Sequence, residues 1–304
     1  MRRTGRVAVA AAAVLAATAA AAPVSAGHRS GPDIVHPSLR PNLVAYYDFD
    51  HPLRGDPALE QDQGRSSTEI ELVNGGAAMR VADRAYPGGG RVLQTRQVNP
   101  GVTGNDDWKA GIWSASGVRT LRPFSNAEGT TVMGWFKRSM DGPAAGFNAI
   151  GLAGVLTGDS DGHAVRALLE LIDVNGELKL VALGRRIDGG NSQTFAATED
   201  WRTLLPKDKW VHLTATFDFT RGTMALYRNG KAVPGGYTRT DDPWLINGPG
   251  PHVTSAADAR GIKIGGSFPQ NTLERNPCDC RMDALMFLDR SLSAREVANQ
   301  FRLF

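Results

Sequence analysis

The sequence lacks an excess of charge of either sign once its N-terminal segment is set aside. Its 304 residues include 34 Lys and Arg and 31 Asp and Glu. Three of the arginines, Arg2, Arg3 and Arg6, lie in a segment that resembles a removable signal, which leaves 31 basic residues against 31 acidic ones. Binding to nucleic acid or to an anionic membrane surface generally requires clustered, unbalanced Lys and Arg. The composition therefore predicts no nucleic-acid partner.

Long hydrophobic runs are also scarce. One apolar, Ala-rich run extends from Val7 to Ala22, after the arginines and before Val24-Ser25-Ala26, small residues that a signal peptidase recognises. We therefore expect residues 1–26 to be a secretory signal peptide that is cleaved after Ala26. A permanent anchor is the alternative, although the run is shorter and less apolar than the roughly 20 residues of a spanning helix. The mature protein is predicted to be secreted, extracellular and not inserted in a membrane.

Cysteine is rare, with only Cys278 and Cys280 in the whole chain. In an extended strand their Cα atoms would lie about 7 Å apart, too far for an unstrained disulfide. Asn276-Pro277 predicts a turn just before them, and a bent chain could close the bridge. Secretion favours a disulfide. Two reduced thiols or a metal site are the alternatives, although two cysteines fall short of the four ligands of a structural zinc.

Helical patterns and internal repeats are largely missing, which argues against helix bundles, propellers and solenoids. The chain instead repeats short runs rich in Val, Leu, Phe, Tyr and Trp, bounded by Gly, Asn, Asp and Pro, a pattern typical of β-strands. We expect strands over residues 43–49, 131–137, 165–173, 177–183, 210–219, 223–228, 261–265 and 282–288. Strict alternation over residues 211–219 predicts one buried face and one polar face that carries His212, Thr214 and Thr216.

Turn and cap signals complete the predicted organisation. Asn175-Gly176 and Asn229-Gly230 predict tight hairpin turns. Ser293 and Glu296 form a capping-box pattern at the start of a single helix. Residues 27–41 contain Gly and Pro without apolar periodicity, so we expect a flexible leader there. One antiparallel all-β domain then follows over residues 42–304.

The order of several segments resembles a known family. These segments are Leu43–Asp50, Gln61–Arg65, Leu72–Gly75, Thr131–Lys137, Lys209–Asp218, Tyr227–Val233 and Met282–Val297. Together they resemble the laminin G-like, concanavalin A-like lectin and glucanase jelly roll of secreted bacterial proteins. The resemblance implies an antiparallel jelly-roll sandwich with one short C-terminal helix. It does not fix the function, because this fold carries lectins, glycosidases, polysaccharide lyases and adhesion domains.

Motifs for catalysis are largely missing, because the sequence contains no serine-nucleophile, phosphate-loop or metalloprotease-helix pattern. A glucanase of the laminarinase type would need the pattern Glu-x-Asp-x-x-Glu on one strand. Glu170 and Asp173 are three residues apart and point to opposite faces of a strand. Glu69 and Glu71 share a face but lack a third carboxylate. We interpret both pairs as solvated strand positions.

A polysaccharide lyase would need a Tyr or His base, with Arg or Asn to neutralise the substrate carboxylate. His212, Tyr227 and Arg228 on neighbouring predicted strands are the candidates, with further polar residues in the loop 185–193. Their spacing is not diagnostic, and a lone His on a polar strand face is typically solvated. A lyase or glycosidase on this scaffold is therefore the alternative function.

Carbohydrate binding is the function that the sequence favours. Sugar recognition uses aromatic rings for the apolar faces of pyranoses and Asp, Asn and Arg for the hydroxyl groups. Residues of both kinds lie in or beside the long predicted loops: Trp108, Trp113, Trp201, Trp244, Asp107 and Asp241. We expect these residues to bind a polysaccharide or a cell-wall glycan. Each loop Trp could instead fill the end of the sandwich, and an adhesion module that contacts protein is a further alternative.

The family resemblance also implies a structural calcium ion at the rim of the sandwich. The matching positions are Asp50, Asp62 and Asp283, with carbonyl oxygens completing the roughly six to eight ligands that calcium prefers. Asp283 stands where related proteins often use Asp for a structural hydrogen bond, which is the alternative. Asp159 and Asp161 form a second acidic loop without the bidentate Glu of a helix-loop-helix calcium site.

Overall fold

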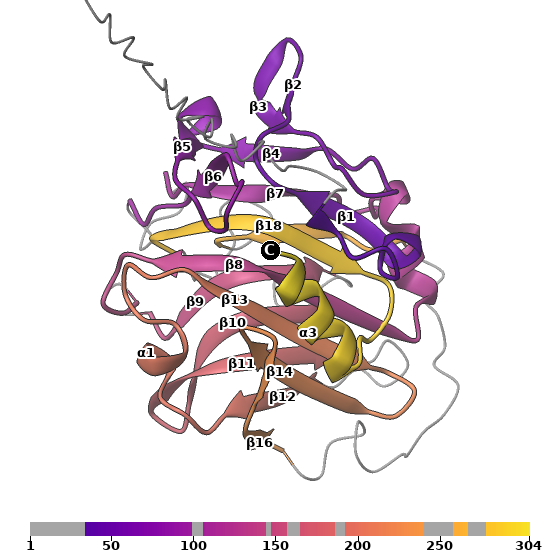
Figure 1. Cartoon of the computed structure of the whole chain (residues 1–304), viewed down its shortest axis with the longest axis vertical. Coiled ribbons are helices and arrows are strands. Elements are labelled where there is room, and N and C mark those ends of the chain that lie inside the picture. The colour runs from indigo at the N-terminus through magenta and orange to yellow at the C-terminus, as the bar shows by residue number, and fades with distance from the viewer. Residues whose placement is uncertain are drawn as a thin grey trace, which may run out of the picture.

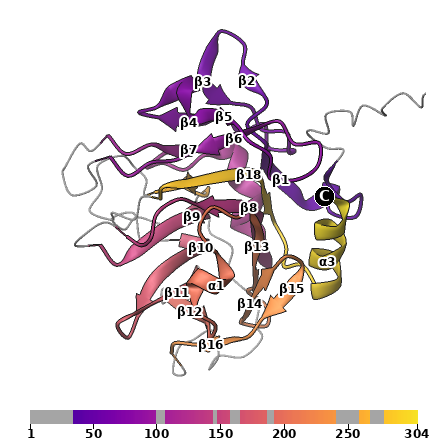
Figure 2. The same ribbon diagram turned by 60° about the vertical axis from the view of Figure 1, so that its left-hand side comes forward.

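The computed structural model describes residues 34–98, 106–143, 147–156, 165–185, 192–239, 258–266 and 278–304. Within these residues the chain folds into two antiparallel β-sheets that pack face to face, with a C-terminal helix on the outer side of one sheet (Figures 1 and 2). This architecture confirms the predicted all-β sandwich with one short C-terminal helix. Among the described residues, no helix is long and apolar enough to cross a bilayer.

The smaller sheet has eight strands. Its order is β15 (Lys231–Val233), β14 (Thr223–Arg228), β13 (Val211–Asp218), β8 (Gly129–Arg138), β18 (Cys280–Leu288), β6 (Arg91–Gln94) and β5 (Arg80–Ala82), and β1 (Leu43–Tyr47) also pairs with β18. The first and last strands of the domain are thus neighbours, as is usual when chain ends meet in one sheet.

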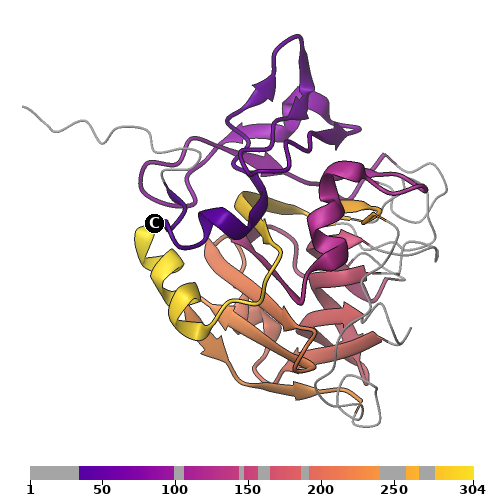
Figure 3. The same cartoon turned by 90° about the vertical axis from the view of Figure 1, so that its right-hand side faces the viewer.

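The larger sheet has ten strands. Its order is β16 (Gly235–Tyr237), β12 (Ser192–Ala197), β11 (Glu177–Arg185), β10 (Val165–Val174), β9 (Ala149–Leu156), β17 (Gly261–Ile264), β7 (Lys109–Trp113), β4 (Ile70–Val73), β3 (Asp56–Glu60) and β2 (Pro52–Leu53). Among the described residues, the helical elements are η2 (Arg40–Asn42), η3 (Gly76–Met79), η4 (Arg119–Asn126), α1 (Trp201–Leu204) and α3 (Ala294–Leu303). The β2–β3 hairpin projects from the sandwich, and η4 and α3 lie on different sides of it (Figure 3).

Both predicted hairpin turns are confirmed. Asn175 and Gly176 have φ angles of 56° and 87°, and Asn229 and Gly230 have φ angles of 49° and 74°. This left-handed backbone is the conformation that an Asn-Gly turn supplies between two antiparallel strands. The turns join β10 to β11 and β14 to β15.

The main core lies between the sheets. Alternate residues of the central strands point inward, among them Val132 and Phe136 of β8, Leu213 and Phe217 of β13, and Leu169 of β10. A second apolar cluster lies on the outer side of the smaller sheet, where Met133 and Met286 pack with Val297 of α3. The smaller sheet is therefore covered on both faces.

Because of this second apolar cluster, the predicted solvent exposure of one face of β13 is wrong. The sequence predicted a polar, solvated face for His212, Thr214 and Thr216, but these residues are 0%, 0% and 4% exposed. Alternation identified the strand correctly but gave the wrong exposure, because α3 covers the face that carries the polar residues (Figure 2).

The N-terminal boundary of the fold also differs from the prediction. Residues 34–41 were expected to belong to a flexible leader, but Ile34, Val35 and Leu39 are buried to 1% exposure or less. The Gln300 side chain accepts a hydrogen bond from the His36 N–H at 2.8 Å and donates one to the Ile34 carbonyl at 2.8 Å. This segment is part of the domain. The rest of the predicted leader and the predicted signal peptide lie outside the described residues.

Candidate functional site

Strands β4 and β7 pair side by side in the larger sheet, with Glu71 opposite Gly111. Their inward residues, such as Leu72 and Ala110, enter the core, so the alternate residues Glu71, Gly111 and Trp113 face outward. Because Gly111 has no side chain, it leaves space between the two larger neighbours.

A pocket of about 780 Å³ lies over this face, within the usual range for ligand sites. Its lining includes Trp113, Glu69, Glu71, Asn74, Ser67 and Thr120. We call it the Trp113 pocket. The Trp113 ring is half-buried and packs against the apolar cluster of Val73, Leu156 and Leu168. It therefore offers a partly exposed aromatic surface beside two exposed carboxylates.

Asp62 holds the loop that forms one wall of this pocket. Its carboxylate accepts hydrogen bonds from the backbone N–H groups of Tyr46 at 2.7 Å, Gly64 at 2.6 Å and Thr68 at 3.2 Å, and from the Ser66 hydroxyl at 2.6 Å. The loop is tied to η4 by the hydroxyl groups of Thr68 and Thr120, which lie 2.7 Å apart. Asp62 thus positions the wall rather than a ligand.

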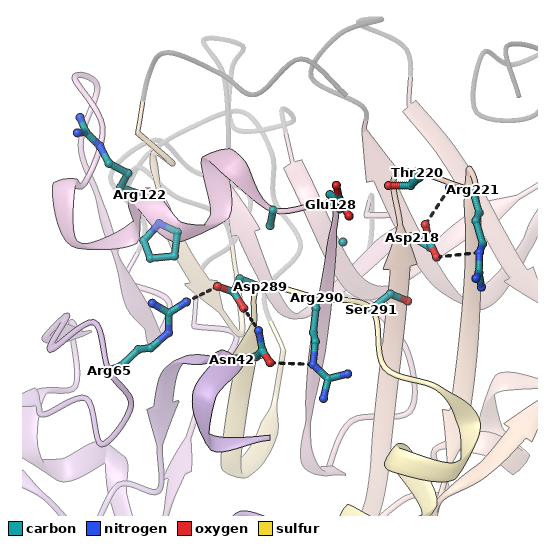
Figure 4. A pocket seen from close by; sticks show the side chains of 13 residues that line it. Asn42, Arg65, Arg122, Glu128, Asp218, Thr220, Arg221, Asp289, Arg290 and Ser291 are labelled. Atoms are coloured by element: carbon teal, nitrogen blue, oxygen red, sulfur yellow. Dashed lines mark hydrogen bonds and ion pairs between the residues drawn. The ribbon is translucent and has the colours of Figure 1, made fainter. Parts of the chain in front are cut away.

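A second pocket, of about 900 Å³, lies where η2, the loop that carries Arg65, η4, the end of β13 and the segment after β18 meet (Figure 4). We call it the end pocket. Arg65 forms an ion pair with Asp289. The Asn42 side-chain amide nitrogen donates to the Asp289 carboxylate at 2.9 Å, and the Asn42 side-chain Oδ1 accepts a hydrogen bond from the Nε of Arg290 at 2.9 Å. These linked polar contacts hold one wall of the end pocket in place.

The opposite wall of the end pocket carries Asp218, Thr220, Arg221 and Glu128. The Arg221 N–H donates to the Asp218 carboxylate at 2.8 Å. Glu128 follows η4 and is exposed. Figure 4 marks no hydrogen bond or ion pair from its carboxylate to the other residues drawn. Gly129 is required beside it, because a Cβ there would lie 2.6 Å from the Phe217 carbonyl oxygen and from the Ser291 nitrogen.

The other predicted sugar-binding residues are not gathered in these pockets. Trp201 is 2% exposed, with the guanidinium groups of Arg138 and Arg202 at 4.5 Å and 4.6 Å from its ring. Trp108 is covered by the Arg96 guanidinium at 4.5 Å. Asp107 is 3% exposed and accepts a hydrogen bond from the Val98 N–H at 2.6 Å.

These three residues make contacts within the protein, because arginine guanidinium groups lie over both Trp rings and Asp107 binds a backbone N–H. Trp244 and Asp241 lie outside the described residues. Two of the predicted aromatic residues that the structure describes line pockets with exposed carboxylates: Trp113 beside Glu69 and Glu71, and Trp201 beside Glu177 and Asp200. Of the two rings, Trp113 is half-buried whereas Trp201 is only 2% exposed, so Trp113 offers the larger surface to a ligand.

Residues 114–298 match the family described as the Concanavalin A-like lectin/glucanases superfamily. The chain belongs to this family. Among curated proteins, none matches the sequence.

Solved structures of other proteins share this fold. A Trypanosoma rangeli sialidase in complex with 2,3-difluoro-KDN is 15% identical with a TM-score of 0.50, and the match covers 86% of this chain and 32% of the sialidase. The botulinum neurotoxin serotype D binding domain is 13% identical with a TM-score of 0.50, covering 87% of this chain and 52% of that domain. This member of the concanavalin A-like superfamily therefore spans about a third to a half of these proteins.

The structure does not assemble the predicted lyase residues into an accessible site. His212 is 0% exposed, and the rings of Trp135, Phe301 and Phe304 lie 5.3 to 5.9 Å from its own. Burial lowers the pKa of His212 to about 3. Tyr227 is 7% exposed, and burial raises its pKa. The Nε of Arg228 donates to the Leu204 carbonyl at 2.7 Å. A base buried under α3 cannot reach a polymer.

The residues predicted to hold calcium in this concanavalin A-like domain do not fit that ion. Asp50, Asp62 and Asp283 are not among the described groups whose ligand atoms lie within 4.8 Å of one another. Asp62 is occupied by its four hydrogen bonds. Asp283 is 1% exposed, and burial raises its pKa well above the ordinary value, which favours a neutral carboxyl group rather than a metal ligand.

One neighbouring group of the rim does bring ligand-type atoms together: Asp48, His51 and Glu60. The Nδ1 of His51 lies 2.7 Å from Asp48, and Glu60 forms an ion pair with Arg80 at 2.6 Å. Burial raises the pKa of Glu60 to about 7 despite the opposing effect of Arg80. Each of these groups already has a protein partner, so the group is a closed network. The predicted loop site at Asp159 and Asp161 lies outside the described residues.

The cysteines lie close together at the start of β18. Cys278 and Cys280 are both 0% exposed, and their Cα atoms are 5.2 Å apart. This distance is within the range that a disulfide spans. The Thr95 hydroxyl donates to the Cys278 carbonyl at 2.5 Å. The predicted turn at Asn276-Pro277 lies outside the described residues. The geometry is compatible with the predicted disulfide.

Sequence reasoning noticed Glu69 and Glu71 but interpreted them as solvated strand positions. Both are exposed, as expected, but both also line the Trp113 pocket with Asn74 and Thr120. The sequence did indicate that the two side chains lie on the same side of the chain, because residues two positions apart in a strand share a face. Their neighbour Trp113 comes from a different strand, so only the sheet pairing places it beside them.

Proposed function

We propose that the protein is a secreted carbohydrate-binding domain that recognises a polysaccharide or a cell-wall glycan in the Trp113 pocket. The observation that supports this most directly is the half-exposed Trp113 ring beside Glu69, Glu71 and Asn74 in one pocket. An aromatic surface stacks on the apolar face of a pyranose, and carboxylate and amide groups bind its hydroxyls.

Two further facts support the proposal. The superfamily to which the chain belongs includes lectins by its own description. Among proteins of similar fold, the sialidase was solved with a sugar analogue, and botulinum neurotoxin type C enters cells through interaction with two ganglioside molecules. The Ala-rich N-terminal run supports secretion, because it has the features of a signal peptide.

A glycosidase is the second candidate, and one observation favours it. Glu69 and Glu71 are both exposed in the pocket that holds Trp113, and glycoside hydrolysis generally uses a pair of carboxylic acids. A polysaccharide that binds and stays intact supports the binding domain. Release of reducing ends that stops in both Glu69→Gln and Glu71→Gln supports the hydrolase.

The test of the binding site is a thermal melt of residues 27–304 against a panel of soluble polysaccharides. A ligand that binds only the folded state raises the melting temperature with the logarithm of its concentration. We expect at least one polysaccharide to raise it for the wild type, and Trp113→Ala to abolish the rise. Trp113→Phe should retain most of it, because a ring remains.

The matched control is Val98→Ser, which removes an exposed apolar side chain, 52% exposed, outside the pocket. Its ligand response should equal that of the wild type. Direct titration of the hit into each variant separates lost binding from lost stability. If Trp113→Ala keeps the full ligand response, the glycan binds elsewhere and the proposed site is wrong.

A further inference from the structure

We propose that Thr120 presents a hydrogen-bond acceptor to the Trp113 pocket, and that the pocket therefore takes glycans whose hydroxyl groups are free rather than substituted as ethers or esters. This inference rests on the proposed function, because it names the class of glycan that the same pocket binds. Thr120 is then a specificity-determining residue. Its hydroxyl is the outer end of a chain of hydrogen bonds that begins at Asp62 and passes through Ser66 and Thr68.

Asp62 is the acceptor at the inner end of this chain. Its two carboxylate oxygens accept the backbone N–H groups of Tyr46, Gly64 and Thr68. The Ser66 hydroxyl donates to the same carboxylate at 2.6 Å. Burial raises the pKa of Asp62, and these four hydrogen bonds counteract that rise. Because an ionised carboxylate has no proton to donate, the single proton of the Ser66 hydroxyl points to Asp62.

The next two contacts fix the direction of the remaining hydroxyl groups. The hydroxyl oxygens of Ser66 and Thr68 lie 2.8 Å apart, and those of Thr68 and Thr120 lie 2.7 Å apart. At these distances a proton lies between each pair of oxygens, and each hydroxyl group carries only one proton. Since the Ser66 proton is used at Asp62, Thr68 donates to Ser66 and Thr120 donates to Thr68.

The Thr120 oxygen consequently offers only lone pairs to the pocket. Thr120 is exposed and lines the pocket, whereas Thr68 is 2% exposed, so Thr120 is the member of the chain that a ligand reaches. Hydrogen bonds in a chain polarise one another, which strengthens the acceptor at its outer end. Glu69 and Glu71 line the same pocket and, when ionised, are acceptors as well.

A wall of acceptors selects among glycans by their hydroxyl groups. A free sugar hydroxyl can turn its proton toward Thr120, while an ether or ester oxygen can only accept. A substituted oxygen in that place would face the Thr120 lone pairs with no proton between the two oxygens, and Thr120 would lose the water that it binds in the free protein. The pocket should therefore prefer an unsubstituted polysaccharide to its methylated or acetylated form.

The experiment titrates three soluble polymers, a β-glucan, a xylan and a mannan, into the protein in a calorimeter. Each polymer is used unmodified, as its methyl ether and as its hydroxyethyl ether at equal substitution. The titrations are done at about pH 8, where an aspartate carboxyl group is ionised. The hydroxyethyl ether is bulkier than the methyl ether but keeps a terminal hydroxyl donor, so it separates the loss of a donor from crowding.

We expect the unmodified polymer that binds best to bind about three- to tenfold more tightly than its methyl ether, the effect of one hydrogen bond. The hydroxyethyl ether should lose less. If the hydroxyethyl ether loses more than the methyl ether, crowding rather than hydrogen bonding sets the preference, and the inference is wrong.

The variant Thr120→Val removes the acceptor with little change in shape. It should weaken the unmodified polymer about three- to tenfold and leave the methyl ether unchanged. Thr120→Ser keeps a hydroxyl group in the same place and should bind as the wild type does. The matched control is Thr223→Val, at an exposed strand position outside the pocket, which should change neither polymer.

The variant Ser66→Ala tests the chain itself, because Ser66 is a positioning residue that acts through Thr68. Without Ser66 the Thr68 proton turns to Thr120, and the Thr120 proton becomes available to the pocket. The ratio of the two affinities, unmodified polymer over methyl ether, should then fall toward unity. A loosened wall would weaken both ligands alike and leave this ratio unchanged. An unchanged ratio therefore overturns the role of the chain.

The outcomes distinguish this inference from the proposed function. Equal binding of an unmodified polymer and its methyl ether by the wild type, with both lost in Trp113→Ala, overturns the selectivity and leaves the proposed function intact. The same conclusion follows if Thr120→Val binds the unmodified polymer as tightly as the wild type does. If no polymer binds the wild type in any form, the proposed function and this inference both fail.

Discussion

The imidazole of His212 is enclosed by aromatic rings on the outer side of the smaller sheet. Burial lowers its pKa from 6.5 to about 3. Because the folded-state pKa lies below that of the unfolded chain, this residue leaves stability intact above about pH 6.5 and reduces it as the pH falls from there toward 3. The same burial that removes His212 from catalysis makes the protein sensitive to acid.

We predict that His212→Leu reduces the loss of stability between about pH 6.5 and pH 4. The wild type should lose free energy of unfolding at up to about 1.4 kcal/mol per pH unit from this group, and the variant should not. Urea unfolding at several pH values measures the difference. His36→Gln, at a surface position, is the control, and a variant curve parallel to the wild type would contradict the argument.

The contribution of Asp283 to stability changes with pH in the opposite direction to that of His212. Its Oδ1 accepts the Ala284 N–H at 2.7 Å, while Oδ2 has no hydrogen-bond partner among the described residues. Burial, and then Asp48, raise its pKa. The folded state therefore holds a proton that the unfolded chain releases, so stability is present below the unfolded pKa near 3.8 and is lost as the pH rises toward the folded value.

We predict that Asp283→Asn stabilises the protein at about pH 8 relative to the wild type, with a smaller gain at about pH 4. The amide keeps the acceptor for Ala284 and carries no charge to bury. Differences in urea midpoint at the two pH values test this. Asp56→Asn, at an exposed position with a similar local backbone hydrogen bond, should show no such pH-dependent gain.

At the scale of elements, the C-terminal helix behaves as its sequence predicts. The Ser293 Oγ accepts the Glu296 N–H at 3.4 Å, and the Glu296 carboxylate accepts the Ser293 N–H at 2.9 Å. Arg290 also binds Glu296 and, as the largest cause, lowers the pKa of Glu296 to about 2. These contacts depend on residues close in sequence, which is why the helix start was predictable.

Removal of this cap should loosen α3. We predict that Ser293→Ala lowers the free energy of unfolding by about 1 kcal/mol, measured by urea denaturation at neutral pH. Arg295→Ala, an exposed position of the same helix, should cost little in comparison. A loss in Ser293→Ala no larger than in Arg295→Ala would show that tertiary packing alone holds the helix.

The strands that were predicted from the sequence are those with a clear alternation of apolar and polar residues or a clear turn signal. β13 and β14 were identified from alternation and an Asn-Gly turn, whereas β9 was missed. β9 contains Gly151 and Gly154, which weaken a strand signal. The structure shows why Gly154 is there, since a Cβ would lie 2.5 Å from the Leu168 side chain on the paired strand. That requirement comes from a neighbour in space and leaves no mark in the local pattern.

At the scale of the whole molecule, the N-terminal segment of the domain and the C-terminal helix bind each other through hydrogen bonds. Gln300 of α3 is 0% exposed and binds the backbone of Ile34 and His36. The N-terminal segment and α3 together cover the outer face of the smaller sheet. A segment without periodicity is thus ordered by a helix at the other end of the chain.

We predict that Gln300→Ala releases residues 34–41. The buried Ile34 carbonyl and His36 N–H lose their partners, which should cost about 1–3 kcal/mol. Hydrogen exchange should rise in residues 34–41 and proteolysis should cut there first. Asn299→Ala, which alters a partly exposed neighbour in the helix, is the control, and unchanged protection of residues 34–41 in Gln300→Ala would contradict this role.

The sequence by itself determined the antiparallel strand pattern, the Asn-Gly hairpins, the capped helix and the family, because each depends on residues within a few positions of one another. The tertiary structure alone decided which polar strand face is buried, which aspartates are hydrogen-bonded within the protein and which Trp lines a pocket beside Glu69 and Glu71. Burial and pocket lining depend on contacts between strands far apart in the chain, as when β4 and β7 bring Glu71 beside Trp113. The amino-acid pattern of one strand does not show which strand pairs with it, so it cannot show which side chains meet across that pair.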